Sequence, residues 1–212
     1  MSDATNLRSP NEVDAKPDQS GLFDMAAGQG GYFTSEQATA YGFSRALVAH
    51  HVKGGKFIRV RRGLYRFRDY PQSPREDVLV AWLAVGRDVA VISHESALDI
   101  LALSDVVPDA AHLTVPRSKR NLPSIAGVRI HTTSRATKPE DVVTRDGMSV
   151  TSATRSILDA AEAGTSPEQI EAAVIQAVER GLTTPERLRQ GATERSKRVA
   201  RVVSRALRDR RA

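Results

Sequence analysis

The stretch "YFTSEQATAYGFSRALVAHHVKGGKFIRVRRGLYRF", residues 32–67, decides how the N-terminal part of the chain folds. Thr34, with Gln37 three residues further on, is the signature of a capping box and predicts a short helix that ends before the next glycine. Ser44 is a favoured N-cap residue and predicts a second helix that runs to about Lys53. Two short helices joined by a glycine-containing turn are typical of a helix-turn-helix.

The end of this stretch, residues 56–67, predicts a β-hairpin. Apolar side chains recur along it, and Arg62-Gly63 is a favourable turn between two strands. A further short helix is expected from Ser20, ahead of a glycine-rich loop. A helix, a helix-turn-helix and a two-stranded wing therefore follow one another within about 50 residues, which is the order of a winged helix.

Charge is distributed unevenly along the chain. Residues 37–68 contain eight Lys or Arg and no Asp or Glu, and residues 195–212 contain eight Lys or Arg and one acidic residue. The remaining residues are net acidic, so the formal net charge of +6 comes from two basic blocks. Like charges that face each other across a hairpin destabilise it. We therefore expect an external partner, the phosphates of DNA, to accept the charge of the hairpin.

In helix-turn-helix proteins the second helix enters the major groove, and flanking elements hold the DNA backbone. The spacing of Val48, His51 and Val52 predicts that they face the core, so that the opposite side of this helix faces outward. Arg45 is then placed to read guanine. The residues expected to contact DNA are Ser44, Arg45, His50 and Lys53 on the helix, and Lys56, Arg59, Arg61 and Arg62 on the hairpin. The alternative is a basic surface that contacts only other proteins.

The remainder of the chain predicts a mixed arrangement of helices and strands, so the expected fold class is α+β, with an N-terminal winged helix-turn-helix and a helical C-terminus. We expect four parts: a disordered tail (1–19), a DNA-binding domain (20–71), an α+β domain (72–193) and an Arg-rich amphipathic helix (194–212). The elements expected in the α+β domain are a helix from Pro74 to about Val85 with Ser73 as its cap, a short strand and a helix capped by Ser93, strands in residues 111–116 and 127–133, a hairpin around Asp146-Gly147, and helices that begin near Ser152, Ser166 and Thr184.

Several functions are disfavoured by what the chain lacks. Without cysteine there is no disulfide scaffold, zinc finger or thiol catalysis. The longest apolar run, residues 78–86, is too short to span a bilayer, and residues 1–21 do not form a signal peptide, so we expect a cytoplasmic protein without membrane contact. Ser93-His94-Glu95 are only neighbours in sequence, which does not make a catalytic triad. The five histidines show no H-E-x-x-H or similar pairing, so we expect no metal site. No acidic cluster indicates a nuclease either, and we expect no cofactor and no enzyme activity.

Five segments, in their order, resemble the AbiEi-type antitoxins of bacterial type IV toxin–antitoxin systems: residues 30–67, "ISHESALDILAL", "HLTVPRSKR", "VRIHTT" and "GMSVTSATRSILDAA". The resemblance extends over about residues 22–190, although "DILALSD" replaces the histidine-glycine pair that is more common in the family. It implies that the winged helix binds double-stranded DNA at the operon's own promoter. It also implies that the second domain counters a toxin encoded alongside, an AbiEii-type nucleotidyltransferase.

The resemblance assigns roles by position. The implied DNA contacts are Ser44, Arg45, Lys53, Arg59, Arg61 and Arg62. The residues that stand in recurrent positions of the second domain are Ser93, His94, Ser96 and Asp159. We interpret these four as structural caps and hydrogen-bonding groups rather than as catalysts.

The resulting hypothesis is a DNA-binding antitoxin that binds inverted repeats, represses its own operon and neutralises a nucleotidyltransferase toxin. One alternative is a stand-alone transcription regulator whose second domain senses a ligand or mediates dimerisation, and another is a module that binds only proteins. The C-terminal helix has Val199, Val202, Val203, Ala206 and Leu207 on one face and Arg198, Arg201, Arg205 and Arg208 on the other. This helix is compatible with a solvated surface helix, a clamp on the DNA backbone or a docking element for the toxin.

Overall fold

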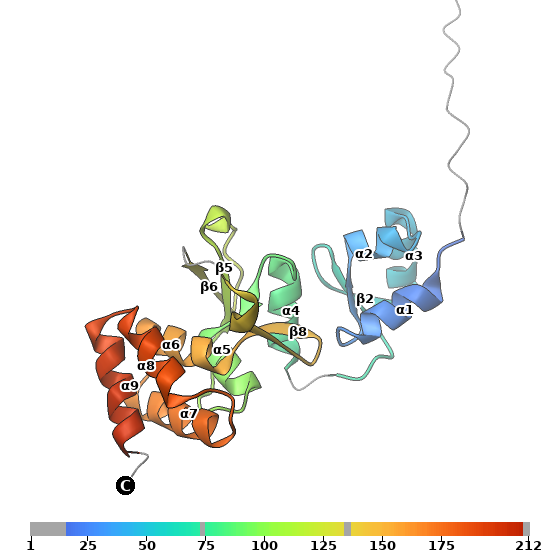
Figure 1. Cartoon of the computed structure of the whole chain (residues 1–212). Coiled ribbons are helices and arrows are strands. Elements are labelled where there is room, and N and C mark those ends of the chain that lie inside the picture. The colour runs from blue at the N-terminus through green and yellow to red at the C-terminus, as the bar shows by residue number, and fades with distance from the viewer. Residues whose placement is uncertain (1–15, 73–74, 134–136, 210–212) are drawn as a thin grey trace, which may run out of the picture.

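The computed structural model describes residues 16–72, 75–133 and 137–209 of the 212-residue chain (Figure 1). The winged helix lies at one end of the molecule, a group of C-terminal helices lies at the other, and a sheet lies between them. This arrangement confirms the α+β fold class with a helical C-terminus. Most of the predicted tail, residues 1–15, lies outside the described residues, and the domain boundaries stay a prediction.

The N-terminal elements have the winged-helix order. They are α1 (Gln19–Ala27), β1 (Tyr32–Thr34), α2 (Ser35–Ala40), α3 (Arg45–Lys53), β2 (Phe57–Arg61) and β3 (Leu64–Phe67). The three strands form an antiparallel sheet in the order β1-β3-β2, with Arg62 and Gly63 as the turn of the wing. The helix-turn-helix and the hairpin are therefore confirmed.

Local hydrogen bonds explain where these helices begin. The Thr34 hydroxyl accepts a hydrogen bond from the Gln37 backbone N–H at 3.2 Å, and the Gln37 side chain accepts one from the Thr34 N–H at 2.8 Å, which completes the capping box. The Ser44 hydroxyl caps α3 by accepting from the Leu47 N–H at 3.2 Å. Strand β1 was not predicted, because it is three residues long and its pairing is with the distant β3.

An aromatic core fixes α3 relative to the wing. Phe33, Phe43, Phe57 and Phe67 are buried in one cluster, and the ring of Phe57 meets those of Phe33 and Phe67 edge-on at centroid distances of 4.9 and 5.0 Å. Aromatic rings favour such edge-on contacts, and truncation of a buried Phe to Ala typically costs about 3–5 kcal/mol. The polar faces of α3 and the wing are therefore held in a fixed relation.

The rest of the chain forms a five-stranded sheet and the C-terminal helices. Its elements are α4 (Glu76–Val85), β4 (Val91–Ile92), α5 (His94–Ile100), β5 (Ala111–Pro116), η1 (Arg117–Lys119), β6 (Val128–Thr133), η2 (Pro139–Asp141), β7 (Val142–Arg145), β8 (Met148–Thr151), α6 (Ala153–Ala163), α7 (Pro167–Glu179), α8 (Pro185–Thr193) and α9 (Lys197–Asp209). The strand order is β6-β5-β4-β8-β7, in which β4 pairs parallel to β8 and antiparallel to β5, and β5 pairs parallel to β6.

The sequence-based expectations for this part are largely confirmed. The hairpin β7–β8 turns at Asp146 and Gly147, whose φ angles of 50° and 75° are those of the tight turn expected for Asp-Gly. Ser73 and Pro74, which were expected to open the first helix, lie outside the described residues, and α4 begins at Glu76. None of the helices among the described residues has the length and apolar character needed to cross a membrane.

The winged helix is joined to the rest of the molecule by a buried contact. Tyr32 and Leu64, each 2 % exposed, belong to the same apolar cluster as the buried side chains of α4. The Tyr32 hydroxyl donates a hydrogen bond to the Glu76 carboxylate, which also lies 3.6 Å from the Arg66 guanidinium. Burial, together with the neighbouring carboxylate, raises the pKa of the Tyr32 hydroxyl, so this group remains a donor.

Candidate functional site

Helix α3 presents one polar face to solvent and one apolar face to the core. Val48 is buried, whereas the residues expected to contact DNA on this helix are all exposed: Ser44, Arg45, His50 and Lys53. The N-terminus of α3, with Arg45 in its first turn, is therefore accessible, as reading of a DNA groove requires.

His51 packs against the core, as the spacing predicted. Its ring lies 5.0 Å from the ring of Phe57 and 5.9 Å from that of Phe43, measured between centroids. Burial lowers the pKa of His51, and the positive charge of Lys56 adds to the effect. The neighbouring His50 is exposed, so the two histidines of α3 have different environments.

Some basic side chains of the wing have no acidic partner in the described part of the chain. Arg59, Arg61 and Arg62 are exposed, and no carboxylate pairs with them among the described residues. Two other arginines of this region serve the fold, because Arg66 is buried beside Glu76 and Arg68 donates a hydrogen bond to a backbone carbonyl. Arg66 and Arg68 are thus held by contacts within the fold, whereas Arg59, Arg61 and Arg62 are exposed and have no acidic partner among the described residues.

Strand pairing separates the like charges of the wing. Arg59 lies opposite Tyr65 and Arg61 lies opposite Leu64, with a bulge between the two arginines. The sequence suggested that like charges would face each other across the hairpin, and the observed register shows that Arg59 and Arg61 do not. The exposed arginines therefore do not compromise the pairing, and Lys56, at the start of the hairpin, is half-buried.

A second concentration of polar side chains lies in the α+β part, where several are buried. The Asp159 carboxylate is held by two guanidinium groups, with Arg155 Nε 2.7 Å from Oδ2 and Arg195 Nη1 2.6 Å from Oδ1. These three residues, together with His94 and His131, line a cavity of about 220 Å³. Because each oxygen of Asp159 already binds a guanidinium group, the carboxylate positions the arginines at the cavity wall.

Ser93 corrects one sequence-based interpretation. It is the N-cap residue of α5, but its hydroxyl makes no capping hydrogen bond. The hydroxyl instead accepts a hydrogen bond from Thr114 Oγ1 at 2.7 Å and lies 2.9 Å from His94 Nδ1. The backbone of His94 has a φ of 53°, in the left-handed region that few residues other than glycine occupy. Ser96 does serve as a hydrogen-bonding group, because its hydroxyl accepts from the His112 N–H at 2.9 Å.

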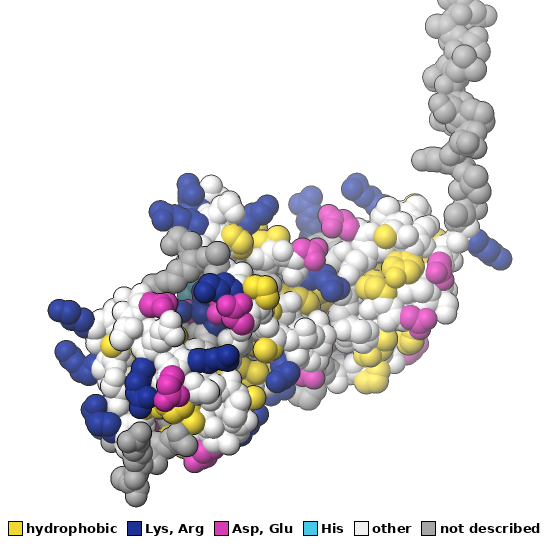
Figure 2. Space-filling view, viewed as in Figure 1, with side chains coloured by type: hydrophobic (Ala, Val, Ile, Leu, Met, Phe, Trp, Pro, Cys, Tyr) yellow, Lys and Arg dark blue, Asp and Glu magenta, His cyan; other side chains and the backbone are white. Residues whose placement is uncertain are grey.

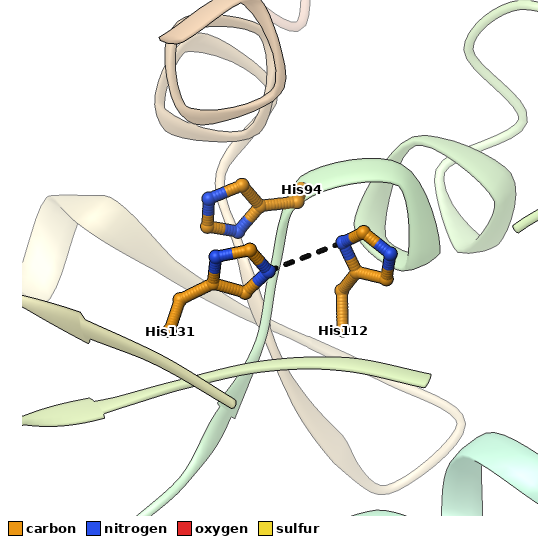
Figure 3. Close-up of side chains that lie close together, drawn as sticks. All are labelled: His94, His112 and His131. Atoms are coloured by element: carbon orange, nitrogen blue, oxygen red, sulfur yellow. Dashed lines mark hydrogen bonds between the residues drawn. The ribbon is translucent and has the colours of Figure 1, made fainter. Parts of the chain in front are cut away.

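Three histidines come together beside this cavity, which the sequence did not predict (Figure 3). The rings of His94 and His131 lie face to face with centroids 3.6 Å apart, and His131 Nε2 lies 3.2 Å from His112 Nδ1. Burial lowers the pKa of His94 to about 2 and that of His131 to about 4, and it lowers the pKa of His112. All three rings are therefore neutral at pH 7.

The register of two parallel strands creates this cluster. Thr114 of β5 lies opposite His131 of β6, and His112 precedes Thr114 by two residues. Side chains two residues apart in a strand point to the same side of the sheet, so His112 and His131 share one side. A search for paired histidines at helical spacing cannot detect this arrangement, because the three residues come from separate elements. The one available signal was a histidine in each of two predicted neighbouring strands.

The C-terminal helix α9 packs through the face that was predicted to be apolar. Val199, Val203, Ala206 and Leu207 are buried. One basic residue of its other face takes part in the fold, because Arg198 donates hydrogen bonds to the carbonyl oxygens of Ala161 and Glu162 at 2.6 and 3.2 Å. Arg201 and Arg208 of the same face are exposed.

Comparison with known proteins identifies the segment that includes the wing. Residues 22–68 match the family of transcriptional regulators described as AbiEi antitoxins. The AbiEi-type segment thus includes all eight residues expected to contact DNA, and the match confirms the resemblance over this part of the chain.

The whole fold also has a structural relative. The chain is similar to the crystal structure of the RV2827C protein from Mycobacterium tuberculosis, with a TM-score of 0.59 and 16 % identical residues, over 90 % of this chain and 75 % of that one. At this level of identity the likeness concerns the fold. No curated protein matches the chain by sequence.

Proposed function

We propose that the protein is a DNA-binding antitoxin that represses its own operon and neutralises a cognate AbiEii-type nucleotidyltransferase toxin. The observation that carries the DNA-binding part is the exposed basic edge of the AbiEi-type segment, formed by Arg45, Lys53, Arg59, Arg61 and Arg62. Because none of these cations pairs with a carboxylate of residues 16–72, 75–133 or 137–209, their charge supports pairing with phosphates and base edges. In this proposal α3 reads the major groove of an inverted repeat, and the wing holds the backbone.

Fluorescence anisotropy with the gene's own upstream DNA and a shuffled control tests the proposal. Each phosphate contact adds about 0.9 to the slope of log affinity against log salt, so Arg61→Ala/Arg62→Ala should lower that slope by about two. The matched control is Arg187→Ala/Arg189→Ala, which removes the same charge from exposed positions of α8. Equal binding of the upstream and shuffled DNA would contradict specific autorepression. An unchanged slope in the wing variant would contradict the role of the wing.

Co-expression with the toxin tests the antitoxin part separately. We expect the wild type and the Arg61→Ala/Arg62→Ala variant to restore growth equally well against a neighbouring nucleotidyltransferase gene, because the wing is assigned to DNA alone. Failure of both to restore growth would contradict the antitoxin part while leaving the DNA result intact.

The polar cavity favours a second candidate, a stand-alone regulator whose α+β part senses a ligand. A cavity of about 220 Å³, lined by two arginines and by the acids Asp159 and Glu162 that pair with them, is suited to a small polar ligand. A nucleotidyltransferase gene next to the gene for this chain would favour the antitoxin, whereas its absence would favour the ligand sensor.

A further inference from the structure

The histidine cluster has a geometry that hydrogen bonding alone does not require. One ligand atom from each of His94, His112 and His131 can be chosen so that all three atoms lie within 4.8 Å of one another. Two of the rings are buried and the third is half-buried, and His94 and His131 line the cavity while His112 lies behind them. In Figure 2 a small area of histidine is visible in this part of the molecule, bordered by basic and acidic side chains. Of the three rings, the half-buried His131 is the one most open to solvent, whereas His94 and His112 are 8 % and 2 % exposed.

We infer that His94, His112 and His131 form a binding site for one divalent transition-metal ion, for which Zn²⁺ is the best match. Imidazole nitrogen is a preferred ligand of Zn²⁺, with bonds of about 2.0–2.1 Å. Bonds of that length at tetrahedral angles separate two ligand nitrogens by about 3.3 Å. The observed separation of 3.2 Å between His131 Nε2 and His112 Nδ1 is close to this value.

The ionisation state of the cluster suits a metal ion. A metal binds the neutral imidazole, and each neutral ring offers one lone pair. His131 Nε2 and His112 Nδ1 lie 3.2 Å apart, so one of these two nitrogens carries the N–H that bonds to the other. For a metal ion to bind both nitrogens, that proton moves to the other nitrogen of the same ring, which is a change of tautomer without net release of a proton.

Polar groups lie beside the ring nitrogens that would not bind the metal. Ser93 Oγ lies 2.9 Å from His94 Nδ1, which leaves the Nε2 of that ring for a metal. His112 Nε2 is buried without a hydrogen bond, and its nearest acidic oxygen is Asp109 Oδ1 at 3.6 Å. Metal-binding histidines commonly donate their second N–H to a carboxylate. A small movement of Asp109 would complete such a pair and satisfy the orphaned nitrogen.

One ring must turn for the metal to bind. The planes of His94 and His131 are inclined by only 15°, and lone pairs in parallel rings do not converge on one point. The backbone of His94 is already in the left-handed region, where strain is often stored at functional positions. We therefore expect the His94 ring to tilt toward the other two when the ion binds.

The fourth position of a tetrahedral ion would face the cavity. Asp159 does not compete for it, because each of its carboxylate oxygens binds a guanidinium group at 2.6–2.7 Å. Three protein ligands with one exchangeable position are typical of zinc sites that bind a water molecule or a further ligand. Because Arg155 and Arg195 are already paired with acids, among them the Glu162 carboxylate at 2.6 Å from Arg195, we expect a water molecule at this position.

Another group of possible ligands lies on the far side of His112, formed with Glu95 and Asp109. Glu95 already accepts a hydrogen bond from Thr165 at 2.7 Å, and Asp109 pairs with Arg129 at 3.0 Å. A set with one nitrogen and two engaged carboxylates suits Zn²⁺ less well than three imidazoles. The experiment below distinguishes the two sides of His112.

Titration of the full-length protein with Co²⁺, followed by its visible absorption and by metal analysis after dialysis, tests the site. We expect one tightly bound ion per chain, with the absorption of a tetrahedral complex, and its displacement by Zn²⁺. His131→Gln should weaken binding by at least about 100-fold, since loss of a residue that only hydrogen-bonds to a metal ligand already lowers metal affinity about 10- to 100-fold. Asp109→Asn should weaken it by about tenfold. The matched control is His50→Gln on the exposed face of α3, which should leave the affinity unchanged.

Two outcomes would overturn the inference. One is that the wild type binds the metal no more tightly than His131→Gln does, and with no better-defined number of ions per chain. The other is binding that is lost in Asp109→Asn but retained in His131→Gln, which would place the ion beside Glu95. If His131→Gln fails to fold, NMR of the imidazole nitrogens in the wild type decides instead. Added Zn²⁺ should shift the signals of all three rings, and unchanged signals would refute the site.

Discussion

Asp159 is a buried acid that neutralises two buried cations, Arg155 and Arg195. We expect Asp159→Asn to lower the free energy of unfolding by about 3 kcal/mol, because both guanidinium groups lose their buried acid and keep only the more exposed Asp141, 3.4 Å from Arg155, and Glu162, 2.6 Å from Arg195. Urea denaturation measures this change. The control is Asp105→Asn at an exposed position, which should stay within about 0.5 kcal/mol of the wild type. A similar loss in the two variants would show that the buried location of Asp159 does not matter.

His51 gives a prediction for pH dependence. Burial and then the charge of Lys56 lower the pKa of His51, so the unfolded chain takes up this proton at a higher pH than the folded chain does. The stability that this group contributes is therefore present above a pH of about 6.5 and is lost as the pH falls below it. In an NMR titration we expect a His51 pKa below about 6.5, and we expect Lys56→Gln to raise it. Lys197→Gln on the distant α9 is the control and should leave the titration unchanged.

Helix α3 begins at Ser44, a residue with two expected roles that can be separated. Ser44→Ala removes the cap and should cost about 1 kcal/mol of stability. Ser44→Asp keeps a capping oxygen but adds a negative charge to the face proposed for DNA. We therefore expect Ser44→Asp to be as stable as the wild type in urea and to bind the upstream DNA more weakly in anisotropy. Unchanged DNA binding by Ser44→Asp would place the N-terminus of α3 away from DNA.

Elements with local signals were predictable from the sequence, and those that depend on distant pairing were not. The starts of α2 and α3 were visible because Thr34 and Ser44 cap their helices within three residues. Strand β1 and the bulge of the wing depend on β3 and left no local pattern. The histidine cluster was missed for the same reason, since it requires the parallel register of β5 and β6 and the unusual backbone of His94. The exposed face of α3 was predictable because its helical period separates core residues from outward ones.

The contact between the winged helix and α4 gives a prediction for the molecule as a whole. Glu76 serves both Tyr32 and Arg66, so Glu76→Gln leaves a guanidinium group buried without a charged partner. We expect the free energy of unfolding to fall by about 3 kcal/mol in urea denaturation. Binding to the upstream DNA should change little, because the Arg66 side chain is buried in this contact. The control Glu179→Gln alters an exposed carboxylate, and an equal loss there would refute the argument.

The same contact limits how the molecule can be divided. The expected domain boundary after residue 71 invites truncation to a small DNA-binding fragment, but such a fragment would expose Tyr32, Leu64 and Val60, which pack into the core that includes α4. A newly exposed apolar patch on a small sheet promotes self-association and aggregation. Isolated winged-helix fragments of this chain should therefore be poorly behaved in solution unless these positions are made polar. Intact protein is the appropriate material for crystallisation, binding assays and antibody production.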